Sequence, residues 1–202
     1  MCFHSKQSKK AQALENRFKA EFIDIDIYIP TEHYNGFSHP QTPVITNTAK
    51  NKIQLFHWGL LPDWATDISF RKNTLNAKIE TIKEKPSFRN SIFKRCLVLA
   101  DGFYEWQWLD EKGKNKQKYL ITMPDDEAFA MAGLWNSWTN QQTGEIMNTY
   151  TILTTVANEA MSIIHNSKKR MPMILKPEEE TVWLNNKEID FKREIELSFN
   201  KQ

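Results

Sequence analysis

Short segments in which apolar and polar residues alternate constrain this chain more than any other sequence feature. In a strand, successive side chains point to opposite faces, so a period of two gives one apolar and one polar face. Turn residues, as in PDWATD and EKGKNKQ, separate several of these segments. The middle of the chain is therefore predicted to be mostly β, in the segments 23–29, 43–46, 52–58, 74–81, 96–108, 118–123, 129–135 and 149–155.

Helical spacing is confined to three flanking segments. Residues 11–22 carry Leu14, Phe18 and Phe22 four residues apart, and residues 156–166 place Ala157, Met161 and Ile164 on one side. The third segment, 176–186, begins with proline and an acidic first turn, and a short strand at 171–175 precedes it. With no repeat or linker, residues 1–202 are predicted to form one α+β domain, with flanking helices around a largely antiparallel, barrel-like β core.

Composition excludes several classes of protein. The first ten residues are polar and basic, unlike a secretory signal, and no apolar run approaches the length needed to span a bilayer. The two cysteines, Cys2 and Cys96, lie in no disulfide or zinc-ligand spacing. We therefore expect a soluble cytoplasmic protein without a metal or other cofactor.

Cys2 is the most unusual residue of the sequence because it directly follows the initiator methionine. Removal of Met1 would leave an α-amine with a pKa of about 7.7 to 8.0 and a thiol with a pKa of about 8.5 on one residue. Both groups would then have a reactive fraction near neutral pH. The alternative is an accidental surface cysteine at a frayed terminus.

Charge and aromatic content leave a nucleic-acid partner open. The net charge of +2 is small, but several of the seven tryptophans lie near basic residues, a combination that suits stacking on unpaired bases. The alternative is that the tryptophans form the core and the lysines a solvated face.

Three further stretches contain residue types suited to catalysis. In NAKIET, a strand would place Asn76, Lys78 and Glu80 on one face. Glu105 lies in an aromatic run, where burial would raise its pKa and suit it to proton transfer, although a place on a wet strand face is also possible. His165 ends a helical pattern, where a cap or a surface group is the alternative to a catalyst.

Taken together, these blocks resemble one family. MC at the start, HWGLLPDWA, NAKIETIKEKPSFRNSIFKRCLVLADGFYEW, and IIH followed by RMPMIL resemble the SOS-response-associated peptidase family, also called abasic-site-processing proteins. The order and spacing of these blocks cover residues 2 to about 175. Two departures are the MCFHSK start, where many members have glycine and arginine after the cysteine, and three additional residues between His165 and RMP.

The resemblance implies a β-rich protein that covalently captures abasic sites in single-stranded DNA through its N-terminal cysteine. It implies that Cys2 is the nucleophile, Asn76 contacts the reacting centre, Glu105 is the acid/base carboxylate and His165 handles protons at ring opening. The residues that it implies face DNA are Trp58, Trp64, Lys78, Arg89 and Arg170.

Other activities stay open beside DNA capture. The family name records a cysteine peptidase that could cleave its own Met1–Cys2 bond, and strand cleavage by a lyase reaction is also open. A non-enzymatic single-stranded nucleic-acid binder is the third possibility. We expect a monomer whose partner is abasic single-stranded DNA rather than a membrane, with nucleoid association when it is bound to DNA.

Overall fold

The barrel-like core is a ring of strands in the computed structural model, which describes residues 2–190 and 195–202. The order around the ring is β11-β10-β7-β4-β5, and β5 pairs with β11 in parallel to close it, through His57 with Thr149 and Trp58 with Tyr150. The other neighbouring strands of the ring are antiparallel. The ring strands are β4 (Gln41–Thr46), β5 (Ala49–Trp58), β7 (Arg95–Ala100), β10 (Phe129–Thr139) and β11 (Ile146–Val156).

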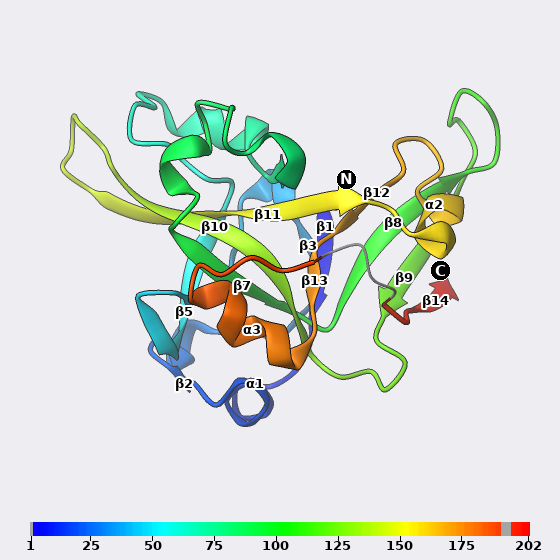
Figure 1. Ribbon diagram of the computed structural model, residues 1–202, viewed down its shortest axis with the longest axis horizontal. Coiled ribbons are helices and arrows are strands. Elements are labelled where there is room, and N and C mark those ends of the chain that lie inside the picture. The colour runs from blue at the N-terminus through cyan, green and yellow to red at the C-terminus, as the bar shows by residue number, and fades with distance from the viewer. Residues whose placement is uncertain (1, 191–194) are drawn as a thin grey trace.

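Short strands extend the ring, and a second sheet lies beside it (Figure 1). The short strands are β2 (Glu21–Phe22), β6 (Asn76–Lys78), β12 (Arg170–Pro172) and β13 (Ile174–Leu175). The second sheet is antiparallel in the order β14-β9-β8-β1-β3. Its strands are β1 (His4–Gln7), β3 (Thr31–Asn35), β8 (Gly102–Trp108), β9 (Lys116–Thr122) and β14 (Ser198–Lys201).

The α+β class and the barrel-like core are therefore confirmed, and so are the three helical regions. The helices are α1 (Ala11–Phe18), α2 (Glu159–Ile164) and α3 (Pro177–Leu184). In Figure 1, α1 and α3 lie below the barrel and α2 lies near β8. Glu179 caps α3 by accepting a hydrogen bond from the Lys176 N–H at 2.8 Å. None of the helices in the described residues is long and apolar enough to cross a membrane.

Local differences from the predicted elements have identifiable causes. Residues 23–29 are not a strand: a 3₁₀ turn occupies Ile25–Ile27, and its isoleucines are exposed, so alternation alone was misleading. The helix at 11–22 ends at Phe18 because Lys19 adopts a left-handed conformation. The strand after Asn76 ends at Lys78 and a 3₁₀ turn begins at Ile79, so Glu80 does not continue the face of Asn76 and Lys78.

The predicted strand 96–108 is divided at Asp101 between the two sheets. β7 belongs to the ring, whereas β8 pairs with β1 through Ser5 with Phe103 and Lys6 with Gly102. The Asp101 N–H donates to the Lys6 carbonyl at 3.0 Å, so the chain changes partners at this residue. Asp101 therefore connects the barrel to the sheet that contains the start of the chain.

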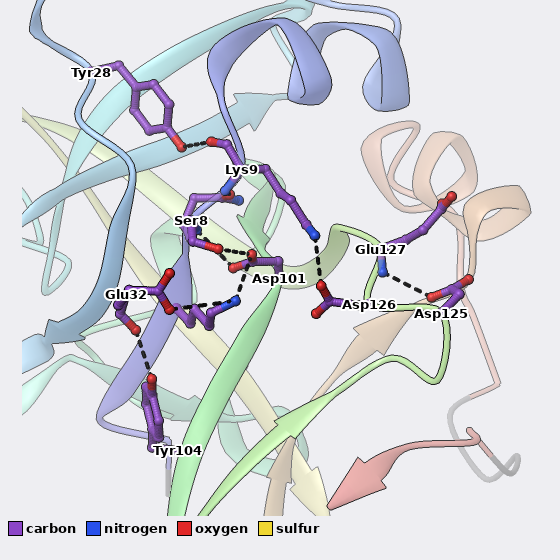
Figure 2. Close-up of polar contacts among 11 residues, drawn as sticks. Ser8, Lys9, Tyr28, Glu32, Asp101, Tyr104, Asp125, Asp126 and Glu127 are labelled. Atoms are coloured by element: carbon purple, nitrogen blue, oxygen red, sulfur yellow. Dashed lines mark hydrogen bonds and ion pairs between the residues drawn. The ribbon is translucent and has the colours of Figure 1, made fainter. Parts of the chain in front are cut away.

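The Asp101 carboxylate fixes β1 from a completely buried position. It accepts hydrogen bonds from the Ser8 hydroxyl at 2.6 Å, the Ser8 N–H at 3.0 Å and the Lys6 ammonium at 3.2 Å. Figure 2 shows this cluster and, nearby, the more exposed ion pair between Lys9 and Asp126, whose charged atoms are 3.1 Å apart. The burial of the Asp101 carboxylate makes its bonds much harder to replace by water.

The two carboxylates give a matched test of this anchor. Asp101→Asn should lower the free energy of unfolding by about 2 to 4 kcal/mol, because it leaves the buried Lys6 ammonium without its main counter-ion. Asp126→Asn removes the exposed pair and should cost less than about 1 kcal/mol. Urea unfolding of both variants measures the difference, and equal losses would contradict the anchoring role.

Candidate active site

Cys2 lies in the interior of the protein rather than at a frayed end. It is fully buried among core residues that include Trp58, Phe103 and Tyr150. The Asn76 side-chain amide donates to its carbonyl at 2.8 Å. Strand β6 holds Asn76 in place by pairing it with Ile152 of β11. The tertiary structure thus fixes the backbone of the second residue, which argues against an accidental surface cysteine.

The Asn76 side chain leaves one buried hydrogen-bond acceptor open at this position, whereas the Cys2 thiol has a partner. The Asn76 Oδ1 atom is buried and makes no hydrogen bond to the described residues, so it can accept one from a ligand. The Cys2 thiol donates a weak bond to the His4 carbonyl at 3.6 Å. Burial, and then the nearby Glu105 carboxylate, raise the pKa of this thiol above its usual range. The thiol therefore keeps its proton near neutral pH until a base removes it.

Glu105 and His165 lie beside each other in the interior. Both side chains are about 95% buried, and 3.9 Å separates Glu105 Oε2 from His165 Nε2. Burial raises the pKa of Glu105 to about 7, so this carboxyl group exchanges its proton near neutral pH. Burial lowers the pKa of His165, so the neutral imidazole predominates at that pH.

The orientation of His165 is set by the backbone at the start of β12. Its Nδ1 lies 2.7 Å from the Arg170 carbonyl and 3.3 Å from the Arg170 nitrogen. The shorter contact places the proton on Nδ1, which leaves the Nε2 lone pair on the side of Glu105. Residues 166–169, which separate His165 from RMP, form a loop that is closed by a hydrogen bond from the Lys169 N–H to the His165 carbonyl at 2.8 Å, and His165 lies beside Glu105.

An open pocket of about 440 Å³ adjoins this pair. Its lining combines the start of the chain, strands β8 and β9, and the loop after α2. Within the described residues, no group of three or more cysteine, histidine or acidic side chains is placed to hold a metal ion. The pocket-lining residues are Phe3, His4, Glu105, Trp106, Trp108, Lys116, His165, Ser167 and Lys168.

Comparison with known proteins now identifies this arrangement. The model of the family described as SOS response associated peptidase (SRAP) matches residues 1–201. The chain belongs to the SRAP family. A solved structure of a protein from Bacteroides thetaiotaomicron, 41% identical, superposes with a TM-score of 0.84 over 92% of this chain and 82% of the other. A Bordetella bronchiseptica structure shares the fold at 21% identity, with a TM-score of 0.80 over 100% of this chain and 99% of the other.

Curated SRAP relatives carry names that refer to abasic sites. The "Abasic site processing protein YoqW" of Bacillus subtilis is 40% identical over 177 residues, 84% of this chain and 76% of the relative. The "Abasic site processing protein HMCES" of Xenopus tropicalis is 31% identical over 206 residues, 86% of this chain. This chain spans 59% of the length of the Xenopus relative.

The predicted DNA-facing residues of this SRAP chain occupy very different environments. Trp58 is fully buried, donates to the Leu75 carbonyl at 2.8 Å and stacks on Tyr150, so it has no free face for a base. Trp64 is 50% exposed and packs edge-on against Phe70. Lys78 and Arg89 are exposed. The structure therefore leaves Trp64, Lys78 and Arg89 accessible to a ligand and places Trp58 in the core.

Arg170 is also mostly buried. Its guanidinium makes two hydrogen bonds to the Glu80 carboxylate, at 2.7 and 2.8 Å, and a third to the Thr154 carbonyl at 2.7 Å. These contacts link the turn after β6 to the strand that orients His165. The Arg170 guanidinium is thus paired with Glu80 inside the protein and is little exposed to solvent.

Sequence reasoning did not select several residues that line the pocket. The alternation of residues along β8 and β9 indicates which of their side chains share a face. Trp106 pairs with Lys118 across strands β8 and β9, and Trp108 pairs with Lys116. These pairs require the register of the hairpin, which the sequence does not show directly. His4 was also missed; its ring lies 4.8 Å from that of Trp106 and its Nδ1 lies 2.9 Å from His33 Nε2.

The raised pKa of Glu105 predicts a pH-dependent stability difference. The native carboxyl binds its proton more tightly than the unfolded one, so wild-type stability should fall as pH rises from about 4.5 to about 7. Glu105→Gln does not titrate, so its stability relative to wild type should rise over the same range by about 2 to 3 kcal/mol. Urea unfolding at pH 4.5 and 8 measures this change.

The exposed Glu111 gives a matched control for the removal of one carboxylate. The free energy of unfolding of Glu111→Gln should differ little from that of wild type at either pH value, because substitutions of exposed side chains have small effects on stability. If the free energy of unfolding of Glu105→Gln also changed between the two pH values as that of wild type does, Glu105 would not hold a proton in the native site near neutral pH.

Proposed function

We propose that this SRAP chain, after removal of Met1, captures abasic sites in single-stranded DNA as a thiazolidine crosslink through Cys2. Met1 itself lies outside the described residues. The observation that carries the proposal is the hydrogen bond from Asn76 that holds Cys2 in the interior, with Glu105 close enough to raise the pKa of its thiol. The names of the relatives support abasic DNA as the substrate.

The first chemical requirement is an open aldehyde, because abasic deoxyribose is mostly a closed hemiacetal. Opening breaks the bond between C1′ and the ring oxygen, which takes up a proton, while the C1′ hydroxyl loses one. The neutral His165 Nε2 is suited to accept the hydroxyl proton. A protonated Glu105, with a pKa of about 7, is suited to protonate the ring oxygen.

The next steps join Cys2 to the sugar. The free α-amine adds to the aldehyde carbon, and loss of one water molecule gives an imine. The thiol sulfur then adds to the same carbon as its proton leaves, and the imine nitrogen gains a proton, which closes a five-membered thiazolidine. Both nucleophiles belong to one fixed residue, so the second addition is intramolecular and has a high effective concentration.

Glu105 is suited to move the protons of these steps because its pKa lies near neutrality. It can protonate the hydroxyl that leaves as water and then accept the thiol proton. The buried Oδ1 of Asn76 can accept a hydrogen bond from the amine or a sugar hydroxyl. Trp64, Lys78 and Arg89 are the exposed predicted residues that we propose contact the DNA strand on either side.

The covalent adduct distinguishes this proposal from the alternatives. Mature wild-type protein should lack Met1 by intact mass and should form a denaturation-resistant band with an abasic single-stranded oligonucleotide. Cys2→Ala should abolish this band, and a tag left on the N-terminus should do the same by blocking the amine. Cys96→Ala should retain the band, because Cys96 is a buried core thiol in β7.

Other outcomes would support a different activity. An active protein that retains Met1, or a tagged protein that still forms the adduct, would contradict capture by the α-amine. Tight binding without any covalent product would favour a plain single-stranded DNA binder. Loss of Met1 in wild type but not in Glu105→Gln would indicate self-cleavage, and shortened oligonucleotide products would indicate a lyase step.

The roles of His165 and Glu105 can be separated with two substrates. A permanently open aldehyde needs no ring opening, so His165→Ala should lose at least about tenfold in capture rate on an abasic site and much less on the open aldehyde. Glu105→Gln should be slow on both. Single-turnover gel assays measure the rates, and an equal defect of His165→Ala on both substrates would exclude the ring-opening role.

A further inference from the structure

The loop that connects α2 to β12 forms one wall of the active-site pocket. Ser167 and Lys168 of this loop line the pocket together with Lys116 of strand β9. The same pocket contains Glu105 and His165. The segment between His165 and RMP therefore contributes side chains to the pocket itself.

Hydrogen bonds hold this loop against β8. The Asn166 side chain donates to the Trp108 carbonyl at 2.8 Å and accepts from the Trp108 N–H at 3.0 Å, as a neighbouring strand would. At the other end, the Lys169 N–H donates to the His165 carbonyl at 2.8 Å and the Lys169 carbonyl accepts from Ala157 at 3.0 Å. Lys168 is thus carried by a loop that is fixed at both ends.

The two lysines give this side of the pocket a positive charge. Both are exposed, and Lys116 Nζ lies 5.4 Å from the centre of the Trp108 ring. Burial is the main cause that lowers the pKa of His165, and the charge of Lys168 makes a smaller contribution in the same direction. The guanidinium of Arg170 is held by Glu80, so Lys116 and Lys168 are the more available cations beside His165.

We propose that Lys168 and Lys116 bind a phosphodiester group next to the abasic sugar. The inference rests on the proposed function, which places the sugar at Glu105 and His165. A sugar bound there carries its flanking phosphates to the pocket wall, and an ammonium group is a suitable partner for a phosphate oxygen. The loop thereby favours an abasic nucleotide inside a strand over one that lacks the phosphate on this side.

Equilibrium binding tests the contact without the covalent reaction. In a Cys2→Ala background with an oligonucleotide that contains a tetrahydrofuran abasic analogue, Lys168→Gln and Lys116→Gln should each weaken binding about two- to fivefold at low salt. Each should also reduce the slope of log affinity against log salt by about 0.7, the value for one phosphate contact on a single strand. Fluorescence anisotropy over a salt series gives both quantities.

Lys169→Gln is the matched control, because Lys169 is the next residue, is equally exposed, and does not line the pocket. It should leave affinity and salt slope close to the parent values. If Lys169→Gln weakened binding as much as Lys168→Gln, the effect would be general surface charge, and the proposed subsite would be wrong. The same conclusion would follow if Lys168→Gln and Lys116→Gln both bound like the parent.

Neutral phosphate analogues locate the contact. Methylphosphonate placed at one linkage at a time should weaken parent binding at a linkage next to the abasic analogue, and Lys168→Gln should lose this sensitivity at that linkage alone. Identical profiles for parent and Lys168→Gln would overturn the proposal. Failure of wild type to form a covalent adduct would instead overturn the proposed function, because these binding assays contain no nucleophilic Cys2.

Discussion

The hydrogen bonds that Asp101 makes with Lys6 and Ser8 hold the strand that follows Cys2. Asp101 holds these residues through its buried carboxylate, and its backbone joins β1 to the point where β7 gives way to β8. Strand β8 then leads within four residues from Asp101 to Glu105. One buried acidic group therefore sets the register between the start of the chain and the carboxyl group of the site.

Burial then determines the chemistry of the site. Removal from water raises the pKa of the Cys2 thiol and of the Glu105 carboxyl and lowers the pKa of the His165 imidazole, so each group favours its neutral form. Neutral groups are inexpensive to bury, and a carboxyl that titrates at about 7 can both donate and accept a proton. Near neutral pH the thiol and the imidazole are thus neutral and the Glu105 carboxyl is partly protonated, while the exposed cations Lys116 and Lys168 line the adjoining pocket.

Arg170 of the RMP motif acts within the protein, through its contacts with Glu80 and His165. The arginine of RMP is bound by Glu80, while its backbone orients His165, so this segment positions the imidazole. The residues between His165 and RMP form a loop that is anchored by Asn166 and includes Lys168 in the lining of the pocket. Arg170 therefore positions the imidazole of His165, whereas the nearby Lys168 is exposed at the pocket.

Sequence by itself determined the β-rich class, the three helical regions and the family resemblance. Periodicity reports which side chains share a face, and the placement of Glu105 two residues after Phe103 led to its expected burial, which the structure has. Asn76 and His165 were selected from motifs, and the structure places Asn76 on the Cys2 carbonyl and His165 beside Glu105.

Only the tertiary structure decided which of the selected residues meet and which are accessible. The burial of Trp58 and the pairing of Arg170 with Glu80 depend on strands β5, β6 and β12, which contact β11 although they are distant in sequence. The break at Asp101 and the exposed isoleucines at 23–29 could not be read from alternation, because it does not specify a strand's partner. Local sequence encodes the faces of each element, whereas long-range pairing decides what each face contacts.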